Sequence, residues 1–302
     1  MLYSMKQLLR NAEAQKYAVG YFEAFNMDAM LACLDAAEKT KSPIIIGFGG
    51  QFISSPKRNA KEDIYHYGAL AKVAAERASV PVAVLLNEAD QIDMIYQGMN
   101  AGFNAVMYQK ADEDPADTLR ITADICRIAH HFGIDVESEV GELPTADIST
   151  GTQSAGCNTD LEVAKNFVQA TGIDALAVAI GNVHLLEGKK AALDFELLER
   201  LHREIDIPLV LHGGTGVAPD EMRKAIELGI SKVNVGTVLK REYINAIRPF
   251  YLEKNLDTID THKTIGWGGE DDMISVGRQA IADKICEFID LFGCAGKADS
   301  VR

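Results

Sequence analysis

The stretch Pro208-Leu-Val-Leu-His-Gly-Gly-Thr-Gly216 is the strongest indication of the fold class, because a short apolar run ends there in a histidine and a glycine-rich loop. A second run, Ala177-Val-Ala-Ile-Gly-Asn-Val-His184, ends in a histidine in the same way. Continuous apolar runs of this length are typical of strands buried on both faces of a parallel sheet. Histidines at the ends of two such strands indicate a metal site. The glycines after His212 leave backbone N–H groups accessible to a phosphate.

Six further runs of β-forming residues lie along the chain, and helix-length segments separate most of the runs. The eight predicted strands are Ala18–Phe25, Pro43–Gly49, Pro81–Asn87, Ala105–Gln109, Asp135–Gly141, Ala175–Gly181, Pro208–Gly214 and Lys232–Thr237. Most of the segments between them open on Asp or Pro, as helices commonly do. This alternation predicts an α/β fold, a (β/α)8 TIM barrel that occupies residues 1–302 as a single domain. Residues 249–302 are predicted to form a helical C-terminal extension.

Composition and charge exclude several functional classes. A hydrophobic content of 47% over 302 residues is sufficient for a full core. The formal net charge of −14 disfavours nucleic acid and anionic membranes as partners. The sequence has neither an apolar run long enough to span a membrane nor the pattern of a signal peptide. The five cysteines lack paired metal-site spacing, so we expect free thiols and a cytoplasmic protein.

Chemistry in such barrels is carried at the carboxyl ends of the strands. The polar and glycine residues at those ends are Asn26, Gly49, Asn87, Glu88, Gln109, Glu137, Glu139, His184, His212 and Asn234. The loops Gly213-Gly-Thr-Gly216 and Asn234-Val-Gly-Thr237 follow the seventh and eighth strands, where barrels often bind phosphate. The polar segment 142–158 is long for an ordinary connection and is predicted to form a lid over the site.

Two glutamates on the fifth strand are expected to need a partner. Glu137 and Glu139 lie on the same side of that strand, facing the interior or the mouth of the barrel. An unpaired carboxylate there is costly. We therefore expect a metal ion or a lysine beside them, and Lys110 from the neighbouring strand is a candidate.

Motifs along nearly the whole chain resemble those of the class II ketose-bisphosphate aldolases, the zinc-dependent fructose-bisphosphate and tagatose-bisphosphate enzymes. The matching motifs are Tyr17-Ala-Val-Gly20, Ala24-Phe-Asn26, Gly102-Phe-Asn-Ala-Val-Met107, Val136-Glu-Ser-Glu-Val-Gly141, Pro208–Gly216 and Lys232-Val-Asn-Val-Gly-Thr237. The resemblance implies a lyase of carbohydrate metabolism that acts on a phosphorylated sugar. It also implies a homodimer or homotetramer.

The resemblance implies a metal site with one altered ligand. It places His184 and His212 on two of the family's three zinc-binding histidines. The family's third-strand signature, Leu-His-Leu-Asp-His, is Val84-Leu-Leu-Asn-Glu88 in this chain, so Glu88 replaces the third histidine. Two histidines and a carboxylate can bind Zn²⁺, and Mn²⁺, Fe²⁺ or Co²⁺ are alternatives. Glu139 matches a family glutamate near the zinc and is a reserve ligand.

The resemblance also implies which residues occupy the proton-transfer position and the phosphate site. The family's catalytic aspartate is Asn87 here, and an amide cannot transfer a proton at neutral pH. Asp90, Glu142, Glu137 and Glu88 remain open as replacements, and Asn87 and Glu142 are our catalytic candidates. The predicted substrate- and phosphate-binding residues are Asn26, Gly213, Gly214, Thr215, Asn234, Gly236 and Thr237.

These features predict a metal-dependent aldolase that cleaves a phosphorylated ketose through a metal-stabilised enediolate. One alternative is a sugar-phosphate isomerase or epimerase on the same scaffold. A second is a non-catalytic sugar-phosphate-binding paralogue, since Asn87 and Glu88 alter the family's pattern. A third is a metal-free aldolase with a Schiff base at Lys110 or Lys232. Structural roles are also open: His184 and His212 as buried histidines bonded to backbone carbonyls, and Glu88 as a helix-starting acid.

Overall fold

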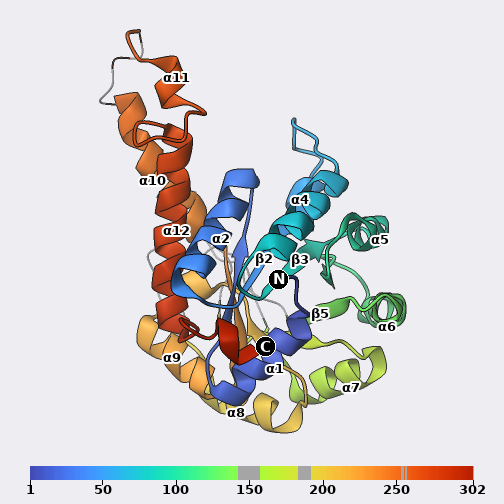
Figure 1. Ribbon diagram of the computed structural model, residues 1–302. Coiled ribbons are helices and arrows are strands. Elements are labelled where there is room, and N and C mark those ends of the chain that lie inside the picture. Colours follow the sequence, from blue (N-terminus) through green and yellow to red (C-terminus); the bar gives the residue numbers. More distant parts are fainter. Residues whose placement is uncertain (142–156, 183–191, 253–254, 256, 302) are drawn as a thin grey trace.

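A closed barrel of parallel strands forms the centre of the molecule (Figure 1). The computed structural model describes residues 1–141, 157–182, 192–252, 255 and 257–301. The strands are β1 (Val19–Glu23), β2 (Ile44–Gly49), β3 (Val82–Ala89), β4 (Ala105–Tyr108), β5 (Asp135–Val140), β6 (Ala175–Val178), β7 (Leu209–Leu211) and β8 (Ile230–Val235). Each strand pairs with its sequence neighbours, and β8 closes the barrel against β1 with Asn234 opposite Tyr21. The predicted TIM barrel is confirmed.

Helices surround the barrel and connect its strands. They are α1 (Met5–Gln15), α2 (Met27–Thr40), α3 (Gly50–Ile53), α4 (Ile64–Arg77), α5 (Ile92–Ala101), α6 (Pro115–His131), α7 (Leu161–Thr171), α8 (Phe195–Glu204), α9 (Pro219–Glu227), α10 (Thr237–Leu252), α11 (Thr261–Thr264) and α12 (Met273–Phe292), with short 3₁₀ turns η1 (Gly214–Gly216) and η2 (Ala298–Val301). Aspartates cap several of them: Asp114, Asp160 and Asp194 accept backbone hydrogen bonds at the starts of α6, α7 and α8. Among the described helices, every one is too short or too polar to span a lipid bilayer.

The interior of the barrel is tightly packed, and one glycine makes room for an aromatic ring. All side chains of β2, β3 and β8 are buried, because helices cover the sheet outside and neighbouring strands fill it inside. A Cβ atom at Gly47 would lie 1.9 Å from the carbonyl oxygen of Leu85 and 3.1 Å from Cε2 of Tyr21. Glycine at this position therefore lets β2 approach β3 and leaves space for the Tyr21 ring.

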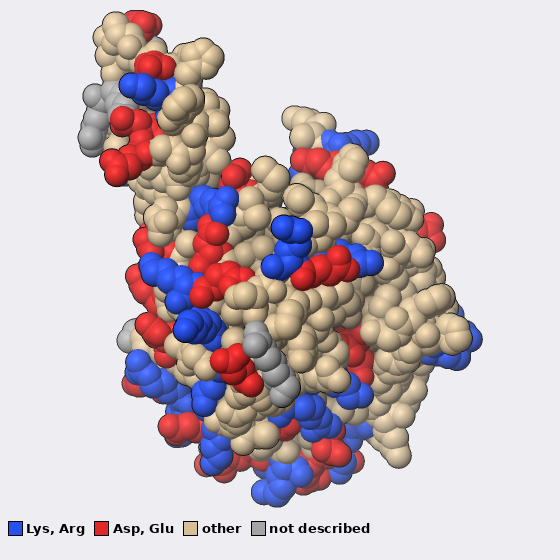
Figure 2. Space-filling model, viewed as in Figure 1, with Lys and Arg blue, Asp and Glu red and all other residues tan. Residues whose placement is uncertain are grey.

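A helical arm formed by α10, α11 and the first turns of α12 projects beyond the barrel (Figure 1). The later turns of α12 pack against the barrel through Ile281, Ile285, Ile289 and Phe292, which are buried. The predicted boundary of the extension, Pro249, falls inside α10. Figure 2 shows acidic and basic side chains mixed over this face of the barrel, with acidic side chains at the end of the arm.

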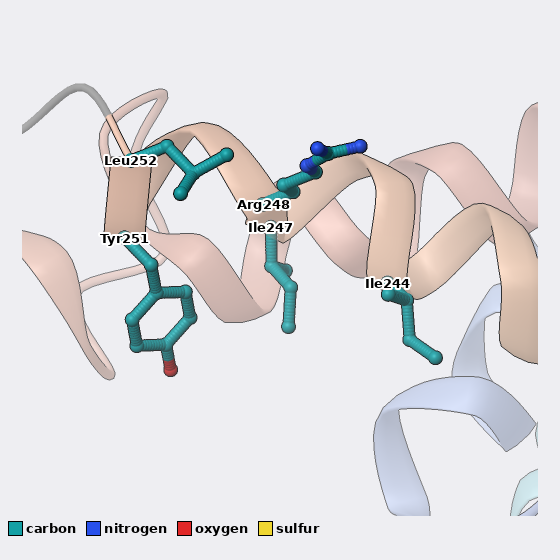
Figure 3. A pocket seen from close by; sticks show the side chains of 5 residues that line it. All are labelled: Ile244, Ile247, Arg248, Tyr251 and Leu252. Carbon is teal, nitrogen blue, oxygen red and sulfur yellow. The ribbon is translucent and has the colours of Figure 1, made fainter.

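One side of α10 in this arm is apolar and exposed. Its side chains line a shallow groove of about 300 Å³ and come from Ile244, Ile247, Arg248, Tyr251 and Leu252 (Figure 3). Their spacing of three and four residues places them on one face of the helix. The exposed fractions of Ile244, Tyr251 and Leu252 are 53%, 57% and 67%, so these side chains have little apolar packing against the described part of the chain.

A buried ion pair lies inside the barrel, between β5 and β8. The Lys232 Nζ atom is 2.8 Å from Glu137 Oε2 and 3.0 Å from Glu137 Oε1, and both side chains are fully buried. Burial alone raises the pKa of Glu137, but Lys232 and the neighbouring His212 lower it overall, so the carboxylate stays charged. The prediction that Lys110 is the partner of Glu137 was wrong. Lys110 is half-exposed and pairs with Glu113 at 3.3 Å, because its backbone lies beyond the end of β4.

Replacing Lys232 with Met removes the cation from this pair. We expect the free energy of unfolding to fall by about 3–5 kcal/mol, because the buried Glu137 carboxylate loses its Lys232 partner and keeps only His212 beside it. Urea denaturation followed by circular dichroism measures the change. Lys110→Met is the matched control and should change stability by about 0–1 kcal/mol, since its ion pair is solvent-exposed. Equal stabilities of the two variants would contradict this account.

Candidate active site

A cavity of about 1000 Å³ opens at the carboxyl ends of the strands. Most of the site residues predicted from the sequence line it, as expected for a barrel of this kind. They are Asn87, Glu88, Glu139, Gly213, Thr215, Asn234, Gly236 and Thr237. The structure therefore brings together residues from β3, β5, the loop after β7 and the end of β8.

Other predicted residues lie elsewhere. His184 and Glu142 are outside the described residues, as is most of the predicted lid. Asn26 is the N-cap of α2, where its Oδ1 accepts a hydrogen bond of 2.8 Å from Ala29 N. β1 ends at Glu23, and Glu23 rather than Asn26 lines the cavity. Gly214 is buried against Val233, where a Cβ atom would lie 2.4 Å from Cγ1.

An irregularity in β3 directs two consecutive side chains toward the cavity. In a regular strand, Asn87 and Glu88 would point to opposite faces of the sheet. The pairing of β3 with β4 shifts register between Leu86 and Ala89, and Glu88 adopts a left-handed conformation with φ of 49°. Such a conformation is unfavourable for a residue with a Cβ atom and is found mostly at functional sites. Because Glu88 lies on β3, three residues before the Gln91 N-cap of α5, the alternative of a helix-starting acid is wrong.

His212 lies directly beyond β7, fully buried among carboxylates. Its Nε2 atom is 3.0 Å from Glu137 Oε1, and its Nδ1 atom is 3.1 Å from Glu139 Oε2 and 3.7 Å from Glu88 Oε1. The His212 backbone is also fixed, since its carbonyl accepts a hydrogen bond of 3.0 Å from Asn182 Nδ2. Burial by itself lowers the pKa of His212, but hydrogen bonds to Glu137 and Glu139 raise it to about 9.

The donor atoms around His212 fit a divalent metal ion in their chemistry. Glu137 holds Nε2, so Nδ1 is the ring nitrogen that faces Glu88 and Glu139, and this is the usual arrangement of a metal-binding histidine and its supporting carboxylate. Glu88 Oε2 accepts a hydrogen bond of 2.6 Å from Gln51 Nε2, which orients the carboxylate. Within the described part of the chain, no three such side chains have the spacing of an assembled metal site.

The same cavity also has the features of an anion site. Gly213 has φ of 68°, and this left-handed conformation starts the tight turn η1 below the cavity. Gly236 and Thr237 precede and begin α10, whose first N–H groups and dipole favour an anion. The Gly213–Thr215 and Gly236–Thr237 segments thus border the same cavity from β7 and β8.

Several cavity residues were missed by the sequence reasoning. Glu23 forms an ion pair of 2.6 Å with Lys240 of α10, and burial raises the Glu23 pKa although Lys240 opposes the shift. Tyr21 and Gln51 also line the cavity. Alternation along β1 from Glu23 could have indicated Tyr21, because residues two apart in a strand share a face.

The acids considered as substitutes for a catalytic aspartate are now distinguished by position. Glu88 and Asp90 line the cavity. Asp90 accepts a hydrogen bond of 3.0 Å from Ser54 Oγ. Glu137 is held inside the barrel by Lys232 and His212. Within the described residues, Glu88 and Asp90 are therefore the members of this set that can reach a substrate.

Comparisons with known proteins agree with this architecture. The family described as fructose-bisphosphate aldolase class-II matches residues 3–297. The uncharacterized protein YdjI of Escherichia coli K12 is 31% identical over 305 residues, covering 99% of this chain and 100% of YdjI. The crystal structure of the YdjI aldolase from E. coli K12 superposes with a TM-score of 0.81 at 29% identity, covering 99% of this chain and 100% of that one.

A more distant solved structure shares the fold. It is the fructose-bisphosphate aldolase of Campylobacter jejuni, with a TM-score of 0.72, 18% identity and coverage of 98% of this chain and 97% of that one. The family match extends over nearly the whole sequence and includes every strand of the barrel. The chain therefore belongs to the class-II fructose-bisphosphate aldolase family.

Proposed function

We propose that this protein is a metal-dependent aldolase that cleaves and forms a carbon–carbon bond in a phosphorylated ketose. One observation carries the proposal: His212, Glu88 and Glu139 converge at a cavity that is also bordered by glycine-rich loops and a helix N-terminus. A metal ligand set beside an anion site suits a substrate that has both a carbonyl group and a phosphate. Membership in the aldolase family supports the same reaction class.

The phosphate would bind between the loops after β7 and β8. Backbone N–H groups of Gly213 to Thr215 and of the first turn of α10 are suited to hydrogen-bond its oxygens. The Thr215 and Thr237 side chains line the same part of the cavity and add hydroxyl donors. Binding there fixes the ketose so that its carbonyl end extends toward His212.

His212, Glu88 and, outside the described residues, His184 would hold the metal, with Glu139 in reserve. A set of two histidines and one carboxylate suits Zn²⁺, and the carboxylate also accommodates Mn²⁺, Fe²⁺ or Co²⁺. When bound, such an ion supplies Lewis-acid polarisation of the substrate carbonyl. Glu137 would orient the His212 ring, since its contact with His212 Nε2 keeps His212 Nδ1 directed toward the cavity.

The metal assignment predicts a specific loss in two variants. Protein purified without chelator should contain about one divalent ion per chain. His212→Ala and Glu88→Ala should each lose it, because each removes a ligand atom. Elemental analysis measures the content, and Glu76→Ala, which changes an exposed acid on α4, should retain the ion. Full metal content in both ligand variants would exclude this site.

The cleavage step requires a hydrogen-bonding residue and a proton carrier near the scissile carbon. Asn87 is buried on the cavity wall and would orient the substrate hydroxyl without transferring its proton. Asp90, three residues further, is the carboxylate we favour for that transfer, because it lines the cavity and Glu88 is assigned to the metal.

Product analysis distinguishes the reaction classes. Metal-loaded protein incubated with ketose 1-phosphates and 1,6-bisphosphates should release a phosphorylated three-carbon ketone and an aldehyde, because the phosphate and carbonyl ends are held together. Nuclear magnetic resonance identifies the products. Asn234→Ala should slow cleavage at least about tenfold by removing a hydrogen bond to the substrate, and Glu76→Ala should not. A single rearranged sugar would indicate an isomerase or epimerase, and binding without turnover would indicate a non-catalytic paralogue.

We also propose that the chain forms a homodimer or homotetramer through the arm. The exposed apolar face of α10 supports this, because such faces on soluble proteins usually contact another protein. Two copies of one amphipathic helix can pack symmetrically, each apolar face against the other.

Charges on that face should prevent the association. Ile247→Asp and Leu252→Asp should shift the sedimenting species to the mass of one chain, because each buries a carboxylate in the contact. Sedimentation velocity measures this shift. Val73→Asp is the control, since Val73 is also an exposed apolar residue and lies on α4, away from the arm. A wild-type protein that sediments as a single chain would rule out the proposal.

A further inference from the structure

Three uncharged polar atoms on the cavity wall are buried without a hydrogen-bond partner among the described residues. They are the Tyr21 hydroxyl, Asn87 Oδ1 and Asn234 Nδ2. The exposed fractions of the three residues are 1%, 2% and 8%, and all three line the cavity. Leaving a buried polar atom unpaired costs about 1–3 kcal/mol. A fold that retains three such atoms around one cavity is arranged for a ligand that pairs with them.

The orientation of the Asn234 amide is fixed by its neighbours. Lys232 Nζ donates a hydrogen bond of 2.6 Å to Asn234 Oδ1, so the oxygen of the amide faces the barrel interior. Glu137 in turn holds Lys232 at 2.8 Å. The NH₂ group of Asn234 is therefore directed away from Lys232 and offers donors only.

Tyr21 lies beside this amide on the adjacent strand. Tyr21 and Asn234 are direct partners in the parallel pairing of β1 with β8. The Lys232 Nζ atom lies 4.9 Å from the centre of the Tyr21 ring, and the ring is packed over Gly47. Burial raises the pKa of the Tyr21 hydroxyl well above its usual range, and the nearby Glu23 and Glu88 carboxylates raise it further. The hydroxyl therefore keeps its proton and is available as a donor.

We infer that Tyr21 is a substrate-binding residue that forms, together with Asn234, a two-donor site for one oxygen acceptor of the substrate. The inference rests on the proposed function for the nature of that acceptor, which is the carbonyl oxygen of a phosphorylated ketose, or the same oxygen as it gains negative charge during cleavage. Donors that are already desolvated and oriented stabilise such charge strongly, because the site need not reorganise as the charge develops.

Tyr21→Phe separates this role from a structural one. The substitution removes only the hydroxyl, so we expect kcat/KM for ketose-phosphate cleavage to fall about 100-fold. Thermal stability should be unchanged or higher, because an unpaired buried polar group is lost. Metal content should match that of the wild type.

Tyr17→Phe is the matched control. Tyr17 is as buried as Tyr21, but its hydroxyl donates a hydrogen bond of 2.7 Å to Asn11 Oδ1 at the opposite end of the barrel. We expect Tyr17→Phe to lower the melting temperature and leave kcat/KM unchanged. The two substitutions should thus have opposite effects on stability and on activity.

The possible outcomes distinguish this inference from the proposed function. A wild-type enzyme that cleaves ketose phosphates, with Tyr21→Phe equally active, would overturn the role of Tyr21 and leave the aldolase assignment intact. A fall in kcat or a rise in KM supports it, and the split between them shows whether the bond forms at the transition state or in the ground state. If the wild type cleaves none of the substrates, the proposed function fails. Thermal denaturation of the variants then still tests whether the Tyr21 hydroxyl has a structural role. A loss of stability in Tyr21→Phe as large as that in Tyr17→Phe would overturn the inference, and a gain would support it.

Discussion

The arrangement of the site depends on the hydrogen bonds that the buried Glu137 carboxylate forms with His212 and Lys232. One oxygen meets His212 Nε2 at 3.0 Å, and Lys232 binds both oxygens from β8. Lys232 then fixes the Asn234 amide at 2.6 Å. A single interior carboxylate thereby orients a candidate metal ligand on β7 and a candidate substrate ligand on β8. A buried polar network is costly when one of its members is missing. Because this network joins β5, β7 and β8, its side chains reach these positions only when the strands are paired in the closed barrel.

The site also contains features that reduce the stability of the fold. Glu88 adopts a left-handed conformation, and the Tyr21, Asn87 and Asn234 side chains each bury an atom without a partner in the described structure. Strain and unpaired polar groups each cost on the order of 1–3 kcal/mol. Together these features mark the cavity as the candidate site of the barrel.

The replacement of the family's histidine and aspartate by Glu88 and Asn87 changes the chemistry that the third strand can supply. The register shift of β3 keeps both side chains at the cavity, so neither has become a core or surface residue. Glu88 remains within reach of His212, and Asn87 retains a polar atom directed at the cavity wall. The third strand therefore still presents two polar side chains to the cavity, with a different pair of functional groups.

Local signals in the sequence were sufficient to predict the barrel, because apolar runs recur eight times and most of the segments between them open on Asp or Pro. The sequence also located most of the cavity residues, since the carboxyl ends of parallel strands meet at one edge. The folded structure was needed to show that Lys232 rather than Lys110 pairs with Glu137, and that Glu23 rather than Asn26 reaches the cavity. These choices depend on the stagger of strands around the closed barrel and on where each strand ends. A one-residue difference in either turns a side chain from the interior to the outside.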